Sequence, residues 1–592
     1  MNRLSTPARV MTLIAMLFAA GPAWSLPRKE EWIELKTANF TLYSNAGRVN
    51  TERIGTNLER LRSALKLLTP DLSLSSPYPT SIFVFKNASS LEPYQRIYNG
   101  RPQKAGGYFM SRSYGNYVAI NGDPRGDEMA NIHHEYLHYV IRNNYPSLPL
   151  WLNEGLAEYY STFEVSGNEA KIGLPHPHHI VWLRKNALIP LPKLLSIDEQ
   201  SPEYNEESPR GSFYAQSWAL VHYLLAGSPD RRLQAVEYLR LIQTGSPREE
   251  AFRKTFGDPA ALERELRAYI QGYVFNFSRA PVEPGTNLTV EARPMAWHDV
   301  LYRLGNLLVN VGAEHEKAAA EHFKAALEAQ PDHGPALSGL GEIEERAGRR
   351  REAQAFYDRA AKLAPGDFLI QYLYGENLLE LDQSRESREK ARAALTRVVA
   401  LQPDFGEAWA RIGYSYNGQE ALPPEAIQAL ETAFRLLPSR MDVTHNLAIA
   451  YAQNGQRDKA LKLIDRMVAA KAEAQYVENA REALLSDTHR RAEVLIGQQK
   501  VEEAIPLLEE VRDKTARPDR RAEIERRIAD VREVLDFNRF ADRYNEAVRL
   551  ANQGKHKDAV AVLEPLVQTT KNPDQARQAQ EMLERIQALL KR

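Results

Sequence analysis

The feature that most constrains the fold of this chain is a repeat with a period of 34 residues in its C-terminal half. Pro331 and Pro365 lie 34 residues apart, and so do Gly341 and Gly375. A unit of this length, with small residues inside it and a proline at its end, predicts two antiparallel helices that approach closely. One unit cannot bury its apolar face alone, so neighbouring units must stack into a superhelix with a concave surface.

The order of small and aromatic residues indicates which kind of repeat this is. One unit contains, in order, Leu340-Gly341, Ala353, Tyr357, Ala360 and Pro365. This order resembles the tetratricopeptide repeat (TPR). Further copies are Gly305, Phe323, Ala326 and Pro331; Gly413, Ala426, Ala433 and Pro438; Ala448, Ala460 and Ile464; and weaker copies around Ala492/Ala504 and Ala547/Ala559. We expect an all-α TPR solenoid over residues 297–470, degenerate TPR-like helical repeats over 471–592, and a protein partner on the concave face.

The N-terminal segment predicts export from the cytoplasm. Arg3 and Arg9 precede a short apolar run, and small residues at Ala23 and Ser25 fit a cleavage site, so residues 1–25 are interpreted as a signal peptide. An uncleaved membrane anchor is the alternative. The chain has no cysteine, which excludes disulfides and thiolate chemistry. We therefore expect an exported protein, with the periplasm as its compartment.

Charge, hydropathy and length bear on nucleic-acid binding, membrane spans and the number of domains. Lys and Arg number 76 against 77 Asp and Glu, so no charge excess points to nucleic acid. No stretch after the signal is apolar enough for a stable membrane span. The 592 residues are too many for one hydrophobic core. We expect at least two domains.

The region before the repeats predicts a domain of the α+β class over residues 26–280. Trp32 to Asn45 alternates like strands, "TSIFVFKN" is typical of a buried strand, and "GGYFMSRSYGNYVAIN" predicts two strands around Tyr114-Gly115. Helical patterns follow, over about 127–142 and from Tyr214 to about Tyr273. Residues 281–296 are rich in proline and predict a linker, which would make the domain independent of the array.

One helix of this domain carries the motif "HEYLH". His134 and His138 are four residues apart, so a helix places both imidazoles on one face, at the spacing of two ligands on one zinc ion. Glu135 is turned about 100° away, where it can accept a proton from metal-bound water. A surface helix with two solvated histidines is the alternative.

A candidate third metal ligand follows His138 after fifteen intervening residues. Glu154 stands in "WLNEG" near the start of the next helical segment, and prolines between the two segments predict a turn that folds the second helix back. Glu158 lies one turn later on the same face, where it can accept a hydrogen bond from a ligating histidine.

"HEYLH" followed by "LWLNEGLAEY" resembles the gluzincin metallopeptidases, and is most similar to the bacterial peptidase-MA-like domains. The resemblance implies a zincin-like fold that binds one Zn²⁺ per chain through His134, His138 and Glu154, with Glu135 as the catalytic base. It also implies an edge strand that holds the substrate. Aminopeptidase relatives carry a glutamate for the substrate amine, whereas the matching stretch here, Ala105 to Arg112, contains no acid.

A gluzincin also needs a donor for the oxyanion, and Tyr214 in "SFYAQSWALVHYLL" is the candidate that the resemblance favours. His222 and Tyr223 are alternative donors. The alternative without a catalytic role is that Tyr214 is an aromatic residue of the hydrophobic core. His176, His178 and His179 lie in "LPHPHHI", which is interpreted as a polar loop rather than a second metal site.

Together these features predict an exported zinc peptidase that acts on a protein or peptide substrate, with TPR repeats that recruit a protein. Two alternatives remain open. One is a non-catalytic periplasmic TPR scaffold with a peptidase-like domain. The other is a TPR-containing HExxH protease of outer-membrane assembly quality control.

Overall fold

The computed structural model describes residues 26–591 apart from short segments. The segments outside the description are 70–71, 75–77, 99, 104–105, 125–127, 146–147, 167, 206, 244–245, 282–290, 383, 420–421 and 471. The predicted signal peptide, residues 1–25, lies outside the described residues, as does the middle of the predicted linker. The chain divides into two compact units between Pro403 and Asp404.

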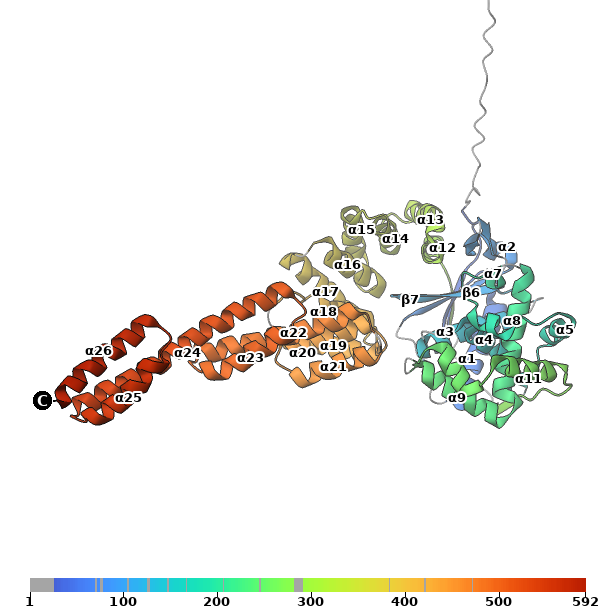
Figure 1. The fold of residues 1–592 in the computed structure, drawn as a ribbon. Coiled ribbons are helices and arrows are strands. Elements are labelled where there is room, and N and C mark those ends of the chain that lie inside the picture. Colours follow the sequence, from blue (N-terminus) through green and yellow to red (C-terminus); the bar gives the residue numbers. More distant parts are fainter. Residues whose placement is uncertain are drawn as a thin grey trace, which may run out of the picture. The chain divides into compact units, whose positions relative to one another are not determined.

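A six-stranded mixed sheet organises the N-terminal part of the first unit, with the strand order β11-β1-β2-β3-β7-β6. Figure 1 labels its strands β6 and β7. β2, β3 and β7 run parallel to one another, and the other neighbours pair antiparallel. β6 is therefore an edge strand, and no strand among the described residues pairs with its outer side. The strands are β1 (Ile33–Lys36), β2 (Thr41–Ser44), β3 (Thr80–Phe85), β6 (Gly107–Arg112), β7 (Gly115–Asn121) and β11 (Glu291–Pro294).

Helices surround this sheet, which agrees with the predicted α+β class. The predicted motif helix is α3, and the predicted long helical region beginning near Tyr214 consists of α8, a π-helical turn η2 and three further helices. The helices are α1 (Arg48–Leu68), α2 (Ala88–Leu91), α3 (Glu128–Asn144), α4 (Leu150–Ser161), α5 (Pro177–Lys185), α6 (Leu191–Ser196), α7 (Pro202–Asn205), α8 (Glu207–His222), η2 (Tyr223–Gly227), α9 (Pro229–Gln243), α10 (Arg248–Phe256) and α11 (Pro259–Gln271). Short elements complete this part: η1 (Glu92–Tyr94), β4 (Ile97–Tyr98), β5 (Arg101–Pro102), β8 (Glu164–Ser166), β9 (Glu169–Ile172) and β10 (Ser278–Pro281).

The glycine of "WLNEG" lets α8 pack closely against α4. A Cβ atom on Gly155 would lie 2.5 Å from the carbonyl oxygen of Ser217 and 2.5 Å from a methyl carbon of Val221. No side chain fits at these distances without moving the helix backbone. Gly155 therefore fixes the position of α4, the helix that carries Glu154.

Paired antiparallel helices form the C-terminal half, as the repeat predicts. The first unit contains α12 (Trp297–Val311), η3 (Ala313–His315), α13 (Glu316–Ala329), α14 (Gly334–Arg346), α15 (Arg350–Leu363), α16 (Phe368–Leu381) and α17 (Arg385–Leu401). A Cβ atom on Gly341 would lie 2.9 Å from the Tyr357 ring, so glycine is required where α14 and α15 touch.

The second unit continues with helices whose lengths become irregular. They are α18 (Gly406–Tyr414), α19 (Pro424–Leu436), α20 (Met441–Gln453), α21 (Arg457–Ala469), α22 (Ala474–Gly497), α23 (Val501–Lys514), α24 (Pro518–Asn552), α25 (His556–Thr569) and α26 (Pro573–Leu590). α22 has 24 residues and α24 has 35, so their lengths no longer fit a 34-residue unit. Among the described helices, none is both long enough and apolar enough to cross a membrane.

The segment that we predicted as a linker is partly a strand of the sheet. Residues 291–294 form β11, which pairs with β1 over four residue pairs, beginning with Ile33 and Pro294. The first repeat follows directly and packs on the sheet domain. The Arg303 guanidinium, for example, lies 4.6 Å from the centre of the Tyr43 ring. Sequence composition missed this pairing because the partner strand lies more than 250 residues earlier in the chain.

Candidate metal centre

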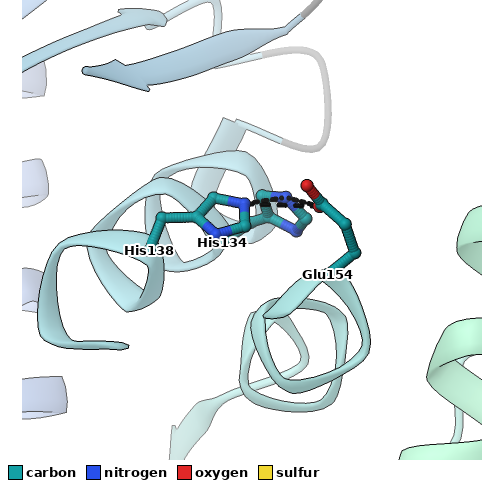
Figure 2. Close-up of side chains that lie close together, drawn as sticks. All are labelled: His134, His138 and Glu154. Carbon is teal, nitrogen blue, oxygen red and sulfur yellow. Dashed lines mark hydrogen bonds and ion pairs between the residues drawn. The ribbon is translucent and has the colours of Figure 1, made fainter. Parts of the chain in front are cut away.

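Two histidines and one glutamate from neighbouring helices converge at one point (Figure 2). His134 and His138 lie one turn apart on α3, and Glu154 reaches them from α4. The two Nε2 atoms are 3.0 Å apart. Glu154 Oε2 lies 3.3 Å from each of these nitrogens. The structure thus brings together the three residues that the sequence predicts as ligands.

The triangle formed by these three atoms has the size that a tetrahedral zinc ion requires. Zinc binds histidine nitrogen and carboxylate oxygen at about 2.0–2.2 Å, so two ligand atoms of a tetrahedral site lie roughly 3.3 Å apart. The separations of 3.0, 3.3 and 3.3 Å agree with this value. Glu154 Oε2 is buried and has no hydrogen-bond partner among the described residues, which is rare for such an atom. A cation inside the triangle would supply its partner.

The outward nitrogens of the two histidines face acceptors that fix their rings. His134 Nδ1 lies 3.4 Å from Glu158 Oε1, and His138 Nδ1 lies 3.2 Å from Asn153 Oδ1. A proton on each Nδ1 leaves each Nε2 lone pair directed into the triangle, the arrangement that histidine ligands of metals use. Glu158 thus stands where we predicted it, whereas Asn153 was not anticipated.

Charge in the triangle is balanced by protons when no metal is bound. Burial alone would lower the pKa of His134, but its contact with Glu154 and the negative charges of Glu158 and Glu135 raise that pKa to about 9. Burial likewise opposes ionisation of Glu154, yet the two histidines hold its pKa below the usual range. Metal ligands must be deprotonated, so metal binding here is expected to release a proton.

Glu135 stands beside the triangle without belonging to it. It is buried, and it lines a cavity of about 490 Å³ together with both histidines. A Cβ atom on Gly107 of β6 would lie 3.1 Å from Glu135 Cγ, so the glycine leaves room for this side chain under the edge strand. Burial raises the pKa of Glu135, while the positive charges of the histidines lower it. A carboxylate in this position can accept a proton from water and return it.

Two tyrosines line the same cavity. The ring of Tyr214 lies 6.2 Å from the His134 ring, and it stacks on Tyr204 at 6.1 Å. The Tyr204 hydroxyl donates a hydrogen bond to Glu154 Oε1 at 3.2 Å. Sequence reasoning missed Tyr204, because it stands in the polar stretch "SPEYNE" without any motif.

The alternatives to Tyr214 lie elsewhere and have other partners. His222 is buried; its Nε2 bonds to the carbonyl oxygen of Gly173 at 3.0 Å, and its Nδ1 lies 2.8 Å from the Tyr269 hydroxyl. Tyr223 donates a hydrogen bond to Glu265 at 2.7 Å. Neither residue lines the cavity.

The three histidines of "LPHPHHI" belong to a helix rather than to a loop. His176 caps the N-terminus of α5, and its Nδ1 accepts from the backbone N–H of His179. His176 and His179 stack at 3.7 Å, and His179 Nε2 lies 3.0 Å from Glu158 Oε2. A neutral His176 with Nδ1 as acceptor carries its proton on Nε2, so it does not present a second lone pair to a metal.

Comparison with known proteins identifies the repeats. Residues 311–376 match the family model described as "Tetratricopeptide repeat". The chain is 28% identical over 173 residues to Superkiller protein 3 of Schizosaccharomyces pombe, which covers 29% of this chain and 12% of that protein. It is 28% identical over 204 residues to Cellulose synthase operon protein C of Xanthomonas axonopodis pv. citri. This match covers 32% of this chain and 13% of that protein. The chain thus spans only about an eighth of the length of these relatives.

Solved structures were matched as well. YrrB, described as a TPR protein with an unusual peptide-binding site, matches 31% of this chain and 90% of its own, with 22% identity and a TM-score of 0.27. PilF of Pseudomonas aeruginosa matches 39% of this chain and 97% of its own, with 16% identity and a TM-score of 0.28. The family match shows that the chain contains tetratricopeptide repeats, units that bind protein or peptide partners, and it favours the interaction-scaffold alternative over the peptidase.

Proposed function

We propose that residues 26–296 form a gluzincin-type, zincin-like peptidase domain that cleaves protein or peptide substrates with one zinc ion per chain. The observation that carries this proposal is the triangle of His134 Nε2, His138 Nε2 and Glu154 Oε2, with sides of 3.0, 3.3 and 3.3 Å. Its dimensions fit zinc, and the buried Glu154 Oε2 accepts no hydrogen bond from the described residues.

Each residue around the triangle is assigned its own role in peptide hydrolysis. When bound, zinc would supply a Lewis acid for the peptide carbonyl and for a water molecule. Glu135 accepts a proton from the attacking water and later passes one to the leaving amine. Tyr214 faces the same cavity and is assigned to the oxyanion that develops on the carbonyl. Glu158, Asn153 and Tyr204 hold the ligands in place.

The proposal also covers the TPR array, the compartment of the protein and the type of peptidase. The TPR array recruits a protein, either the substrate itself or an adaptor, through its concave face. Residues 1–25 direct export, and the periplasm is the proposed compartment, which suits a chain without cysteine. The absence of an acid in the stretch from Ala105 to Arg112 argues against an aminopeptidase.

A second candidate function is that of a non-catalytic TPR scaffold. The observation that favours it is the match of residues 311–376 to the TPR family. In this case the repeats assemble partners, and the zinc site stabilises the N-terminal domain without catalysing a reaction. The intact Glu135 beside the triangle favours the peptidase, because a purely structural zinc site does not require a base.

The two candidates differ in the effect of Glu135→Gln. For the peptidase, this change keeps the zinc and lowers hydrolysis of a broad peptide library by at least about a hundredfold, because general base catalysis contributes roughly 10²–10⁴-fold. The measurement is cleavage analysed by mass spectrometry, with the zinc content of each protein determined in parallel. His178→Gln, at an exposed position, is the matched control and should cleave like the wild type. Equal cleavage by wild type and Glu135→Gln, or none by the zinc-loaded wild type, supports the scaffold.

A further inference from the structure

The cleft at the metal triangle extends along the edge strand β6. A second cavity of about 590 Å³ adjoins the one of about 490 Å³ that contains Glu135. Both are lined by Arg96, Phe109, His138, Glu154 and Tyr204, so they are neighbouring parts of one cleft. A peptide held along β6 with its scissile bond at the triangle would pass Arg96 in either part.

Arg96 occupies the open side of this edge strand. It lies between η1 and β4, and its Nη2 donates a hydrogen bond to the carbonyl oxygen of Phe109 at 2.8 Å. Its guanidinium carbon lies 5.8 Å from the centre of the Tyr108 ring. These two contacts hold the guanidinium against β6. Its remaining N–H groups can still donate to a ligand, since a guanidinium carries five.

No carboxylate of the described residues forms an ion pair with Arg96, although it is partly buried. A partly buried guanidinium normally has an anionic partner, because desolvating a charge without one is costly. Arg96 thus lines the cleft beside the metal triangle, and none of the described carboxylates pairs with it.

The wall of the cleft carries charges of both signs. The second cavity is lined by four arginines and three acids. The arginines are Arg96, Arg112, Arg142 and Arg248, and the acids are Glu154, Asp198 and Glu199. The first cavity adds two more acids, Glu135 and Glu158. It is therefore the position and contacts of Arg96 itself, and not the charge of the wall, that favour an anionic ligand.

We propose that Arg96 binds a carboxylate of the peptide substrate beside the scissile bond. This inference rests on the proposed function and names the substrate class of the same site. A guanidinium matches a carboxylate with two parallel hydrogen bonds, which gives both strength and orientation. The carboxylate is either the C-terminal group of the substrate or an acidic side chain within it. The first source makes the enzyme a carboxypeptidase, and the second makes it an endopeptidase that selects acidic residues.

Peptide binding to the zinc-loaded full chain tests this inference. The probes are three fluorescein-labelled peptides of one neutral sequence: an amidated form, a form with a free C-terminal carboxylate, and an amidated form with one central Gln replaced by Glu. Glu135→Gln is the background, so that the probes are not cleaved. At least one acidic probe is expected to bind tenfold or more tightly than the neutral one, because it alone forms charged hydrogen bonds with the guanidinium. The acidic probe that binds more tightly than the neutral one identifies the source of the carboxylate.

Variants then assign the effect to Arg96. Arg96→Gln should abolish the preference for the acidic probe. Arg96→Lys keeps the charge but not the paired hydrogen bonds, and should retain an intermediate preference. Arg101→Gln, at an exposed position on β5, is the matched control and should bind like the parent. Melting temperatures of all variants establish that each is folded.

The outcomes separate this inference from the proposed function. Equal binding of the three probes, no binding of any, or a preference that survives Arg96→Gln overturns the role of Arg96. Wild-type protein that cleaves all three peptides with equal kcat/KM also overturns it, while the peptidase function stands. An acidic preference that depends on Arg96, in a protein that cleaves nothing, supports the carboxylate site and refutes the peptidase.

Discussion

At the scale of single residues, the two oxygens of Glu154 have different surroundings. Oε1 accepts a hydrogen bond from the Tyr204 hydroxyl at 3.2 Å, while Oε2 lies 3.3 Å from both Nε2 atoms. Rotation of the carboxylate would break these contacts, so Tyr204 fixes which oxygen faces the triangle. Glu158 and Asn153 fix the rings of the two histidines in the same manner. The ligand atoms are thus oriented before a metal binds.

A buried histidine at the end of α8, away from the metal triangle, is expected to make the first unit sensitive to acid. His222 is neutral, with Nε2–H donating to Gly173 and Nδ1 accepting from Tyr269, and burial lowers its pKa to about 4. The unfolded value is about 6.5, so between these pH values the unfolded chain binds a proton that the folded chain excludes. Stability contributed by this residue is therefore present above pH 6.5 and lost as the pH falls towards 4, by up to about 3 kcal/mol.

Thermal melting of the metal-free protein at pH 7.5 and pH 5 measures this effect. The wild type is expected to lose melting temperature at pH 5, and His222→Gln should lose less on the same change of pH. His178→Gln, at an exposed position, should follow the wild type. If His222→Gln and the wild type show the same pH dependence, His222 does not cause the acid sensitivity.

At the scale of elements, the β6–β7 hairpin connects the cleft to the repeats. The Tyr114 hydroxyl, at its turn, bonds to Asn310 Oδ1 at 2.9 Å and to Glu342, and Arg346 donates to it at 3.3 Å. Arg112 at the end of β6 donates to the carbonyl oxygen of Asn310. All of these contacts lie within the first unit. The edge strand that lines the cleft is therefore anchored at one end by α12 and α14.

Removal of the Tyr114 hydroxyl should weaken the attachment of the β6–β7 hairpin to α12 and α14. Tyr114→Phe removes one donor of the buried Glu342 carboxylate, which keeps Arg346 as its ion-pair partner at 2.7 Å. A hydrogen bond to a charged group contributes about 1.5–3 kcal/mol, so the change should destabilise the first unit. We expect a lower melting temperature and a reduced kcat/KM for peptide cleavage, with the zinc content unchanged. Tyr273→Phe, whose parent side chain is 95% exposed, is the control. An unchanged melting temperature would show that the hydrogen bond to Glu342 contributes nothing.

Local patterns explain what the sequence could predict and what it could not. The His134–His138 spacing, the repeat and the strand pattern all arise from neighbours in the chain, so they can be recognised without a structure. Tyr204 and Arg96 reach the cleft only through tertiary packing and carry no motif. β11 lies in a proline-rich stretch that is typical of linkers, and its pairing with β1 depends on a contact distant in sequence.

At the scale of the whole molecule, the first unit extends beyond the N-terminal sheet domain. It ends at Pro403, so it includes the repeat helices from α12 to α17. β11 completes the sheet, and Tyr114, Tyr43 and Tyr94 all contact repeat residues. The first repeats are therefore structural support for the sheet domain, and the later repeats remain available for partners.

Truncation tests this division of the chain. A protein of residues 26–403 should be folded and bind zinc, because it keeps β11 and the contacts of the hairpin. A protein of residues 26–284 should be less stable or insoluble, because it loses β11 and exposes the buried Tyr114. Melting temperature and zinc content of the two proteins are the measurements. A shorter protein with the stability of the longer one would contradict the supporting role of the repeats.

The zinc content of the purified chain, measured by elemental analysis, tests the central claim most directly. The account predicts about one zinc per chain in the wild type, in Glu135→Gln and in the control His178→Ala. His134→Ala and Glu154→Ala remove one of the three ligand atoms each and should lose most of the metal. A His134→Ala protein that is folded and retains the full zinc content would contradict the proposed site.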